Sequence, residues 1–313
     1  MGRIAALFPG QGSQAVGMGR DLAERWPEAA AVFSAADQAL ADSLSKLCWE
    51  GPEEALRLTE NTQPALLAHS IAAWRVLEGA GVKVEAMAGH SLGEYSAVVA
   101  AGGLDLADAL CTVRLRGRLM QNAVPVGQGA MAAVLGLDDE QVSEACAEAT
   151  AAGVGVVVAA NHNSPGQVVI AGDVVAVDRA IELCRARGAR RAMPLPVSAP
   201  FHSPLMAPAR EALTPALEAL EFEALAVPVY RNIDALPVVE PGDVRDGLIR
   251  QVDAPVRWAE TIRRMVADGF DTFIEVGTGS VLCGLVRRVH KEARCIPAGT
   301  TETVLAAAGE FGS

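Results

Sequence analysis

The sequence has no long hydrophobic run. No stretch of its 313 residues reaches the roughly 18 uninterrupted apolar residues that a membrane-spanning helix needs. The opening residues also have too short an apolar run for a signal peptide. We therefore expect a cytoplasmic protein.

The sequence also has no recognisable metal-binding cluster. Its six cysteines include no Cys-x-x-Cys pair, and no His/Cys group has the spacing of a metal site. We expect reduced, mostly buried thiols and no bound metal. The cysteines are Cys48, Cys111, Cys146, Cys184, Cys283 and Cys295.

Basic residues are few relative to acidic ones. There are 26 Lys and Arg against 38 Asp and Glu, which gives a formal net charge of −12. This charge argues against nucleic acid as a partner, and an acidic partner would need a local basic patch. The apolar fraction of 51% is that of an ordinary globular protein with a large core.

One pentapeptide organises the rest of the chain. Gly89-His90-Ser91-Leu92-Gly93 follows an apolar lead-in and precedes an Ala- and Val-rich run, which is the strand, turn and helix pattern of a nucleophile elbow. The glycines suit a turn with no room for Cβ atoms beside the serine. The helix that starts near Leu92 would direct its free N–H groups toward whatever Ser91 attacks. Alone, this pattern also occurs by chance.

A Gly-rich polar loop follows the first strand. The strand at 3–8 leads into Pro9-Gly10-Gln11-Gly12-Ser13-Gln14, whose backbone N–H groups could hold a ligand. The spacing is not that of a dinucleotide site, and the loop lacks the Lys of a phosphate-binding loop. A tight structural turn remains the alternative.

One arginine has an unusual helical phase. Asp105 is a good N-cap for a helix to about Asn122. Arg114 and Arg118 share one face, which we expect to be solvated. Arg116 points the other way, toward apolar residues, where a guanidinium is costly to bury without an anion. An internal acidic partner or a side chain that reaches back to water is the alternative to an anionic ligand.

Residues 127–197 show a different pattern of predicted strands and helices. Their predicted elements run β-α-β-β-α-β, which is the order of a ferredoxin-like unit. We expect strands at 129–135, 155–161, 166–171 and 190–195, and helices at 138–151 and 174–187. This order predicts a small subdomain inserted into a larger one.

His202 is the candidate base. It lies between Pro200 and Pro204 in a loop that we expect to be extended and rigid. His162, which we place in a loop, is its rival, and we expect His90 to point into the core. A solvated loop histidine is the alternative for either.

The remaining segments continue an α/β pattern. We expect strands at 225–230 and 272–276, helices at 244–252 and 258–268, and a final helix from 277 to about 291. Residues 309–313 read as a possible cloning remnant outside the fold.

Three features together resemble a known family. Phe8–Gln14, Gly89–Ser96 and a His beyond an inserted β-α-β-β-α-β unit are similar to the malonyl-CoA:acyl carrier protein transacylases of fatty-acid synthesis and to the acyltransferase domains of polyketide synthases. Supporting motifs extend the resemblance from Phe8 to about Arg288. They are Asn61-Thr62-Gln63-Pro64-Ala65, Arg116-Gly117, Asn163-Ser164-Pro165-Gly166-Gln167, Arg250-Gln251 and Glu275-Val276-Gly277.

The resemblance implies an α/β fold with an α/β-hydrolase-like large subdomain, a parallel sheet and an inserted ferredoxin-like small subdomain. The expected large subdomain is discontinuous, at 1–126 and 198–308, and the small subdomain occupies 127–197. The active site is expected in the cleft between them.

The resemblance also implies a role for each site residue. Ser91 is expected as the nucleophile, His202 as its base, and the backbone carbonyl of Gln251 as the group that orients His202. The backbone N–H groups of Gln11 and Leu92 would form the oxyanion hole. The residues expected to bind the substrate are Arg116, which would hold the malonyl carboxylate, together with Gln63, Asn163, Phe201 and Met120.

The implied reaction uses malonyl-CoA and the phosphopantetheine thiol of acyl carrier protein as substrates, with no bound cofactor. We expect a monomer. Because carrier protein is acidic in this family, the basic cluster of Arg187, Arg190 and Arg191 is a candidate docking site, with a solvated helix end as the alternative. The alternative functions are an acyl-CoA thioesterase or other serine hydrolase, an acyltransferase that serves a polyketide synthase, and a non-catalytic module.

Overall fold

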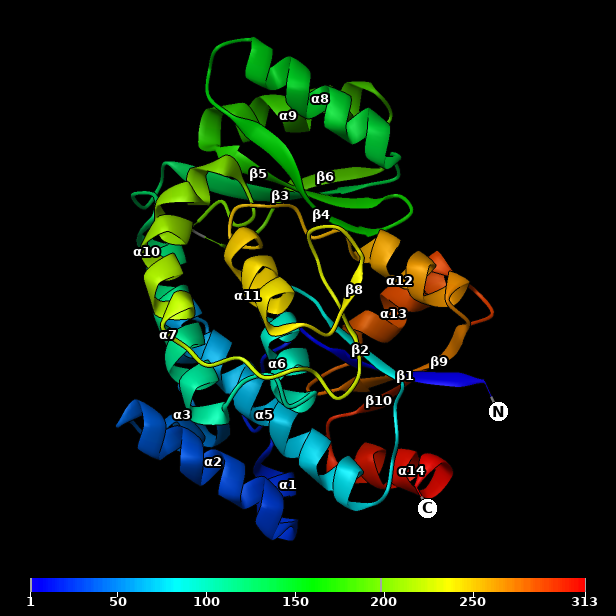
Figure 1. Cartoon of the computed structure of the whole chain (residues 1–313). Helices are drawn as coiled ribbons and strands as arrows, with labels where there is room; N and C mark the ends of the chain where they lie inside the picture. Colours follow the sequence, from blue (N-terminus) through cyan, green and yellow to red (C-terminus); the bar gives the residue numbers. More distant parts are fainter. Residues whose placement is uncertain (1, 198, 313) are drawn as a thin grey trace.

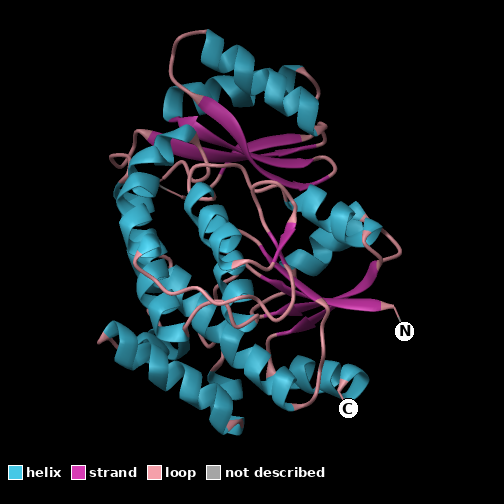
Figure 2. Cartoon of the chain, viewed as in Figure 1, coloured by secondary structure: helices cyan, strands magenta, loops and turns pink. Residues whose placement is uncertain are grey.

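The computed structural model describes residues 2–197 and 199–312. They form two sheets, each covered by helices (Figures 1 and 2). Both chain termini lie in the part that contains the larger sheet, and the smaller sheet lies apart from it with α8 (Asp139–Ala151) and α9 (Val174–Ala186) on its outer side. We call these two parts the large and small subdomains.

The large sheet is built around β1 (Arg3–Phe8). Its strand order is β10-β9-β1-β2-β7-β8, and all pairs are parallel except β7 with β8. The other strands are β2 (Ala86–Gly89), β7 (Val229–Tyr230), β8 (Pro237–Val238), β9 (Phe270–Val276) and β10 (Arg294–Ala298).

Both faces of this sheet are buried, as expected for parallel strands with nearly continuous apolar sequences. Ala6 and Phe8 of β1 pack into one hydrophobic core, while Ala5 and Leu7 pack into a second core on the opposite face. The alternation follows from the period of two in a strand.

Helices supply the other half of each core. The first core contains residues of α2, α5, α6 and α7, and the second contains residues of α12 and α13. The helices of the large subdomain are α1 (Arg20–Arg25), α2 (Pro27–Leu40), α3 (Leu44–Glu50), α4 (Glu53–Leu56), α5 (Thr59–Gly79), α6 (Leu92–Ala100), α7 (Leu106–Asn122), α10 (Ala207–Glu218), α11 (Pro241–Arg250), α12 (Trp258–Ala267), α13 (Val281–Val289) and α14 (Thr301–Phe311), with a 3₁₀ turn η1 (Pro204–Met206).

The small subdomain has the predicted ferredoxin-like topology. Its antiparallel sheet has the order β4-β5-β3-β6, and a third hydrophobic core lies between this sheet and its two helices. Asp138 and Gln141 form a capping box that starts α8. The strands are β3 (Gly129–Leu135), β4 (Val157–Ser164), β5 (Gln167–Asp173) and β6 (Arg191–Pro194).

A short backbone contact joins the two subdomains. Val256 of the large subdomain donates to Ala160 O at 2.8 Å and accepts from His162 N at 2.9 Å. The predicted boundary falls at residues 197 and 198, and Ser198 lies outside the described residues.

The C-terminal part differs from the prediction. The helix expected to end the fold is followed by β10, which forms the edge of the large sheet, and by α14. Residues 309–311, which the sequence suggested to lie outside the fold, form the end of α14, where Phe311 packs against the core and Glu310 pairs with Arg294. Ser313 lies outside the described residues. β10 contains Pro297, which argues against a strand in the sequence, whereas Thr300 and Thr303 form a capping box that starts α14.

Two expectations about side chains were also wrong. Cys283 in α13 and Cys295 in β10 form a disulfide, with Cα atoms 5.0 Å apart, whereas we expected all thiols to be reduced. Packing of α13 against β10 brings them together, which their spacing of 12 residues does not reveal. The Arg114 side chain is only 11% exposed and reaches Asp42, so it is not solvated like Arg118.

No helix in residues 2–197 and 199–312 combines the length and the apolar character needed to cross a membrane.

Candidate active site

Ser91 lies in a sharp turn between β2 and α6. Its φ of 51° and ψ of −107° are unusual for a residue with a side chain, so the backbone strain is at the serine itself and not at a neighbouring glycine. A Cβ atom at Gly89 would lie 1.9 Å from the Gly93 backbone, and one at Gly93 would lie 2.0 Å from Phe8 O. The two glycines are therefore required by the close approach of β1, β2 and α6.

His202 is the base that the fold brings to Ser91. Its Nε2 lies 2.7 Å from Ser91 Oγ, although the two residues are 111 positions apart. Its Nδ1 lies 3.0 Å from Gln251 O and 3.2 Å from Ala254 O. Because carbonyl oxygens only accept, Nδ1 carries the proton and Nε2 is free to accept the Ser91 hydroxyl proton.

The environment keeps His202 neutral. Burial, assisted by the positive charge of Arg116, lowers its pKa from 6.5 to about 3. A neutral imidazole near pH 7 is the form that a general base requires.

The loop that carries His202 is not extended as we expected. The backbone φ of His202 is 58°, which places this residue in a tight turn just before η1.

Two backbone N–H groups beside Ser91 are available to an oxyanion. Leu92 is the first residue of α6, so its N–H has no intrahelical acceptor. In the part of the chain that the structure describes, the N–H of Gln11 also has no protein acceptor. Both residues line the same cavity as Ser91. The Ser91 N–H is already used, because it donates to Asn232 Oδ1 at 2.7 Å.

Arg116 is buried beside the nucleophile, as its helical phase indicated. Its side chain is 1% exposed and donates to Gln63 Oε1 at 2.9 Å, to Gln251 Oε1 at 2.8 Å and to Ser91 Oγ at 3.3 Å. Its guanidinium carbon lies 5.5 Å from the Tyr95 ring centroid. It forms no ion pair with any described carboxylate, so the alternative of an internal acidic partner is not realised.

A buried network behind Ser91 was not anticipated from the sequence. Glu94 accepts from Gln251 Nε2 at 2.8 Å and from Asn232 N at 2.9 Å, and burial raises its pKa to about 7. Asn232 also donates to Gly89 O at 2.7 Å. Glu94 belongs to the Gly89–Ser96 motif that the sequence shows, whereas Asn232 has no sequence signal except its position after a strand.

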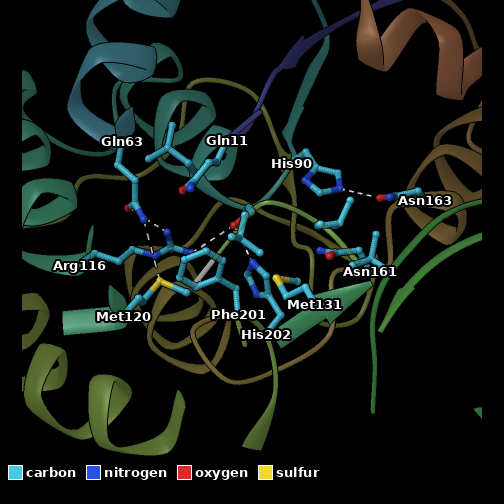
Figure 3. A pocket seen from close by; sticks show the side chains of 15 residues that line it. Gln11, Gln63, His90, Arg116, Met120, Met131, Asn161, Asn163, Phe201 and His202 are labelled. Carbon is cyan, nitrogen blue, oxygen red and sulfur yellow. Dashed lines mark hydrogen bonds between the residues drawn. The ribbon is translucent and has the colours of Figure 1, made fainter. Parts of the chain in front are cut away.

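Ser91, His202 and Arg116 line a cavity of about 190 Å³ between the two subdomains (Figure 3). Every residue predicted to act in catalysis or substrate binding lines it, except Gln251, which lies behind Arg116 and His202. The lining residues are Gln11, Gln63, His90, Ser91, Leu92, Arg116, Met120, Met131, Asn161, Asn163, Val169, Leu195, Val197, Phe201 and His202.

His90 and Asn163 connect the two subdomains across this cavity. His90 does not point into the core as we expected, because its Nε2 lies 2.8 Å from Asn163 Oδ1 (Figure 3). The pair lies on the opposite side of the pocket from Gln63 and Arg116. His162, the rival base, belongs to β4 instead of a loop and lies 3.1 Å from Asp139, outside this cavity.

The predicted docking arginines lie outside the cavity and are not equivalent. Arg187 donates to Glu148 Oε2 and to Gln141 O, both at 2.8 Å, so its charge is already paired within the small subdomain. Arg190 and Arg191 are exposed and form no ion pair with any residue in the described ranges. Only these two keep the free charge that the docking hypothesis needs.

One group of potential metal ligands exists within the described residues. Glu275, Cys283 and Cys295 lie close together, but the two cysteines form the disulfide. Both Glu275 oxygens accept backbone N–H groups, from Leu282 at 3.0 Å and from Cys283 at 2.7 Å. This donor set is therefore already occupied.

Comparison with known sequences gives one family for nearly the whole chain. The acyl transferase domain family matches residues 6–306. A malonyl CoA-acyl carrier protein transacylase of Bacillus subtilis is 48% identical over 304 residues, which cover 97% of this chain and 96% of the relative. The protein of the same name from Escherichia coli K12 is 49% identical over 290 residues, which cover 92% and 93%.

Solved structures agree with this result. An acyl carrier protein S-malonyltransferase from Vibrio cholerae superposes with a TM-score of 0.94 at 48% identity, covering 97% of this chain and 99% of the other. A malonyl-transacylase in complex with its type II PKS acyl-carrier protein superposes with a TM-score of 0.95 at 45% identity, covering 98% and 99%.

Proposed function

This chain belongs to the acyl transferase domain family, and we propose that it transfers the malonyl group of malonyl-CoA to the phosphopantetheine thiol of acyl carrier protein. One observation carries the proposal: a buried, unneutralised Arg116 lies 3.3 Å from the same Ser91 hydroxyl that His202 activates. A nucleophile for a thioester and a receptor for a carboxylate therefore share one cavity.

In the first half-reaction, Ser91 Oγ attacks the thioester carbonyl carbon while His202 Nε2 accepts the hydroxyl proton. The negative oxygen of the tetrahedral intermediate is stabilised by the N–H groups of Gln11 and Leu92. The carbon–sulfur bond then breaks, and His202 returns the proton to the departing CoA thiol. The product is a malonyl ester of Ser91.

In the second half-reaction, the phosphopantetheine thiol gives its proton to His202 and attacks the ester carbonyl. The same two N–H groups stabilise the oxyanion. The bond to Ser91 Oγ then breaks, and His202 returns the proton to the serine. Each cycle restores both residues, so the exchange needs no bound cofactor.

Arg116 selects the acyl group in this scheme. A guanidinium binds a carboxylate through two parallel charge-assisted hydrogen bonds, and it cannot lose its charge near neutral pH. Phe201, Met120 and Asn163 line the rest of the space available to the acyl group. A serine hydrolase would need no such buried cation, so we do not favour that alternative.

We further propose that the acidic carrier protein docks on the small subdomain through Arg190 and Arg191, and that the chain acts as a monomer in the cytoplasm. The exposed, unpaired guanidinium groups support the docking part of this proposal. They provide local positive charge on a protein whose net charge is −12.

The test is acylation of Ser91 by radioactive malonyl-CoA. We expect one malonyl group per chain, visible also by intact mass, and transfer of the label to carrier protein. The Ser91→Ala variant should take up no label and should not react with a fluorophosphonate probe. Retained labelling of that variant would exclude Ser91 as the nucleophile, and release of free malonate in place of transfer would identify a hydrolase.

A further inference from the structure

Among the described residues, every hydrogen-bond partner of Arg116 is a neutral group. Its two terminal nitrogens donate to the amide oxygens of Gln63 and Gln251 and to the hydroxyl of Ser91. Its Nε is buried and has no partner within the described residues. Both terminal nitrogens of this buried guanidinium therefore donate hydrogen bonds, but no partner in the described part of the chain carries a charge that would neutralise it.

The orientation of the Gln251 amide is fixed from behind. Its nitrogen donates to Ser91 O at 3.0 Å and to Glu94 Oε2 at 2.8 Å, and both atoms are acceptors. The amide oxygen must therefore face Arg116. Glu94, the acidic side chain behind this network, is separated from the guanidinium by the whole Gln251 amide.

Gln63 accepts a hydrogen bond from Nη1 of Arg116, the terminal nitrogen that does not contact Gln251. Within residues 2–197 and 199–312, its own amide nitrogen has only the weak acceptor Met120 Sδ at 4.0 Å, so its oxygen is the group that accepts from Arg116. A carboxylate at position 63 would have nearly the same shape as the amide. It would form a buried ion pair with Arg116 and cancel the charge that an acyl carboxylate needs.

We propose that Gln63 and Gln251 are specificity-determining residues: they position Arg116 through neutral amide oxygens, so that its charge stays available for the carboxylate of the acyl substrate. This inference rests on the proposed function, in which Arg116 binds the malonyl carboxylate. The amides satisfy the hydrogen bonds of the buried guanidinium before substrate arrives, so the receptor is preorganised without being filled.

The test compares malonyl-CoA with acetoacetyl-CoA, in which a methyl group replaces the charged carboxylate oxygen. For each variant, kcat/KM of Ser91 acylation is measured by intact mass for both substrates. In Gln63→Glu the ratio of malonyl to acetoacetyl acylation should fall by about 10- to 100-fold, the range expected for a lost hydrogen bond to a charged group.

Gln63→Met is the matched control, because it removes the amide oxygen without adding a charge. Its ratio should fall much less than that of Gln63→Glu, because Arg116 loses one neutral hydrogen-bond partner but keeps its full charge and its bond to Gln251. The double variant Glu94→Gln/Gln251→Glu provides an independent arm, because it moves the carboxylate next to Arg116 at constant net charge. Its ratio should fall as in Gln63→Glu.

Fluorophosphonate labelling of Ser91 confirms that each variant retains a folded site. An unchanged ratio in a reactive Gln63→Glu protein, or an equal fall in Gln63→Met, overturns the inference. If Gln63→Glu does not react with the probe, the double variant decides the question by the same criterion. Failure of the proposed function would look different, because the unmodified protein would then show no preference for malonyl-CoA.

Discussion

The side-chain oxygen of Asn232 accepts a 2.7 Å hydrogen bond from the backbone N–H of Ser91, across 141 residues of sequence. The nitrogen of the same amide donates to Gly89 O at 2.7 Å. One side chain therefore joins both sides of the nucleophile elbow and holds Ser91 in its strained conformation. Its oxygen also occupies the Ser91 N–H, so the backbone N–H groups of Gln11 and Leu92 are the ones available to bind the oxyanion.

Replacing Asn232 with alanine should loosen the elbow. Asn232→Ala leaves the Ser91 N–H and the Gly89 carbonyl without partners in a buried site, at a cost of at least about 2 kcal/mol. We expect a lower urea midpoint and a kcat that falls more than KM changes, because the reacting atom loses its position. An unchanged urea midpoint together with an unchanged kcat would show that the two hydrogen bonds of Asn232 do not hold the elbow in place.

The acid limit of the reaction should lie well below the ordinary pKa of histidine. Because the pKa of His202 is lowered to about 3, the base stays neutral as the pH falls through 6.5 and is lost only nearer 3. In Glu94→Gln, which lacks the other buried group with a pKa in this range, the rate of Ser91 modification by an uncharged fluorophosphonate should therefore stay nearly level from about pH 8 to about pH 5. A midpoint near pH 6.5 would contradict this prediction.

Two variants identify the groups that shape this profile. Burial is the main cause of the lowered His202 pKa and the positive charge of Arg116 lowers it further, so in Arg116→Gln the acid limb should move to higher pH. Glu94, whose pKa is raised to about 7, also titrates in this window, and Glu94→Gln removes its contribution. If Glu94→Gln shifts the acid limb and Arg116→Gln does not, the group whose titration limits the rate is not His202.

Arg116→Ala should separate acyl groups by charge. We expect malonyl-CoA acylation to fall by about 100-fold, because the lost interaction is a hydrogen-bonded ion pair with the substrate. Acetyl-CoA has no carboxylate, so its use should be spared or improved. Parallel measurements of kcat/KM check the prediction, and an equal loss with both substrates would remove Arg116 from this role.

Charge reversal should reveal the docking site. In Arg190→Glu/Arg191→Glu, KM for carrier protein should rise at least about threefold at low salt, with a smaller effect at high salt. Acylation by malonyl-CoA should be unaffected, because both residues lie outside the cavity. Arg57→Glu, a charge reversal at the exposed C-cap residue of α4 in the large subdomain, is the control. An unchanged KM in the double variant would place the docking surface elsewhere.

Several parts of the fold could be predicted because their signals are local. The elbow around Ser91 depends on two glycines within two residues of it, and α7 begins directly after its N-cap Asp105, whose side chain accepts from Ala107 N and Asp108 N. The small subdomain followed from the order of periodic segments. The final strand β10 contains Pro297, which argues against a strand, whereas α14 begins with a capping box of Thr300 and Thr303, a local signal that the sequence prediction did not use.

The sequence by itself determined the nucleophile turn, the Gly-rich loop and the phase that turns Arg116 toward the core, because neighbouring residues set backbone geometry and helical direction. The tertiary structure decided which groups meet there. Asn232 and Glu94, the side-chain role of Gln251, the His90–Asn163 pair and the disulfide all depend on contacts between distant segments. Packing of the two sheets and their helices sets these contacts, and residue spacing does not record them.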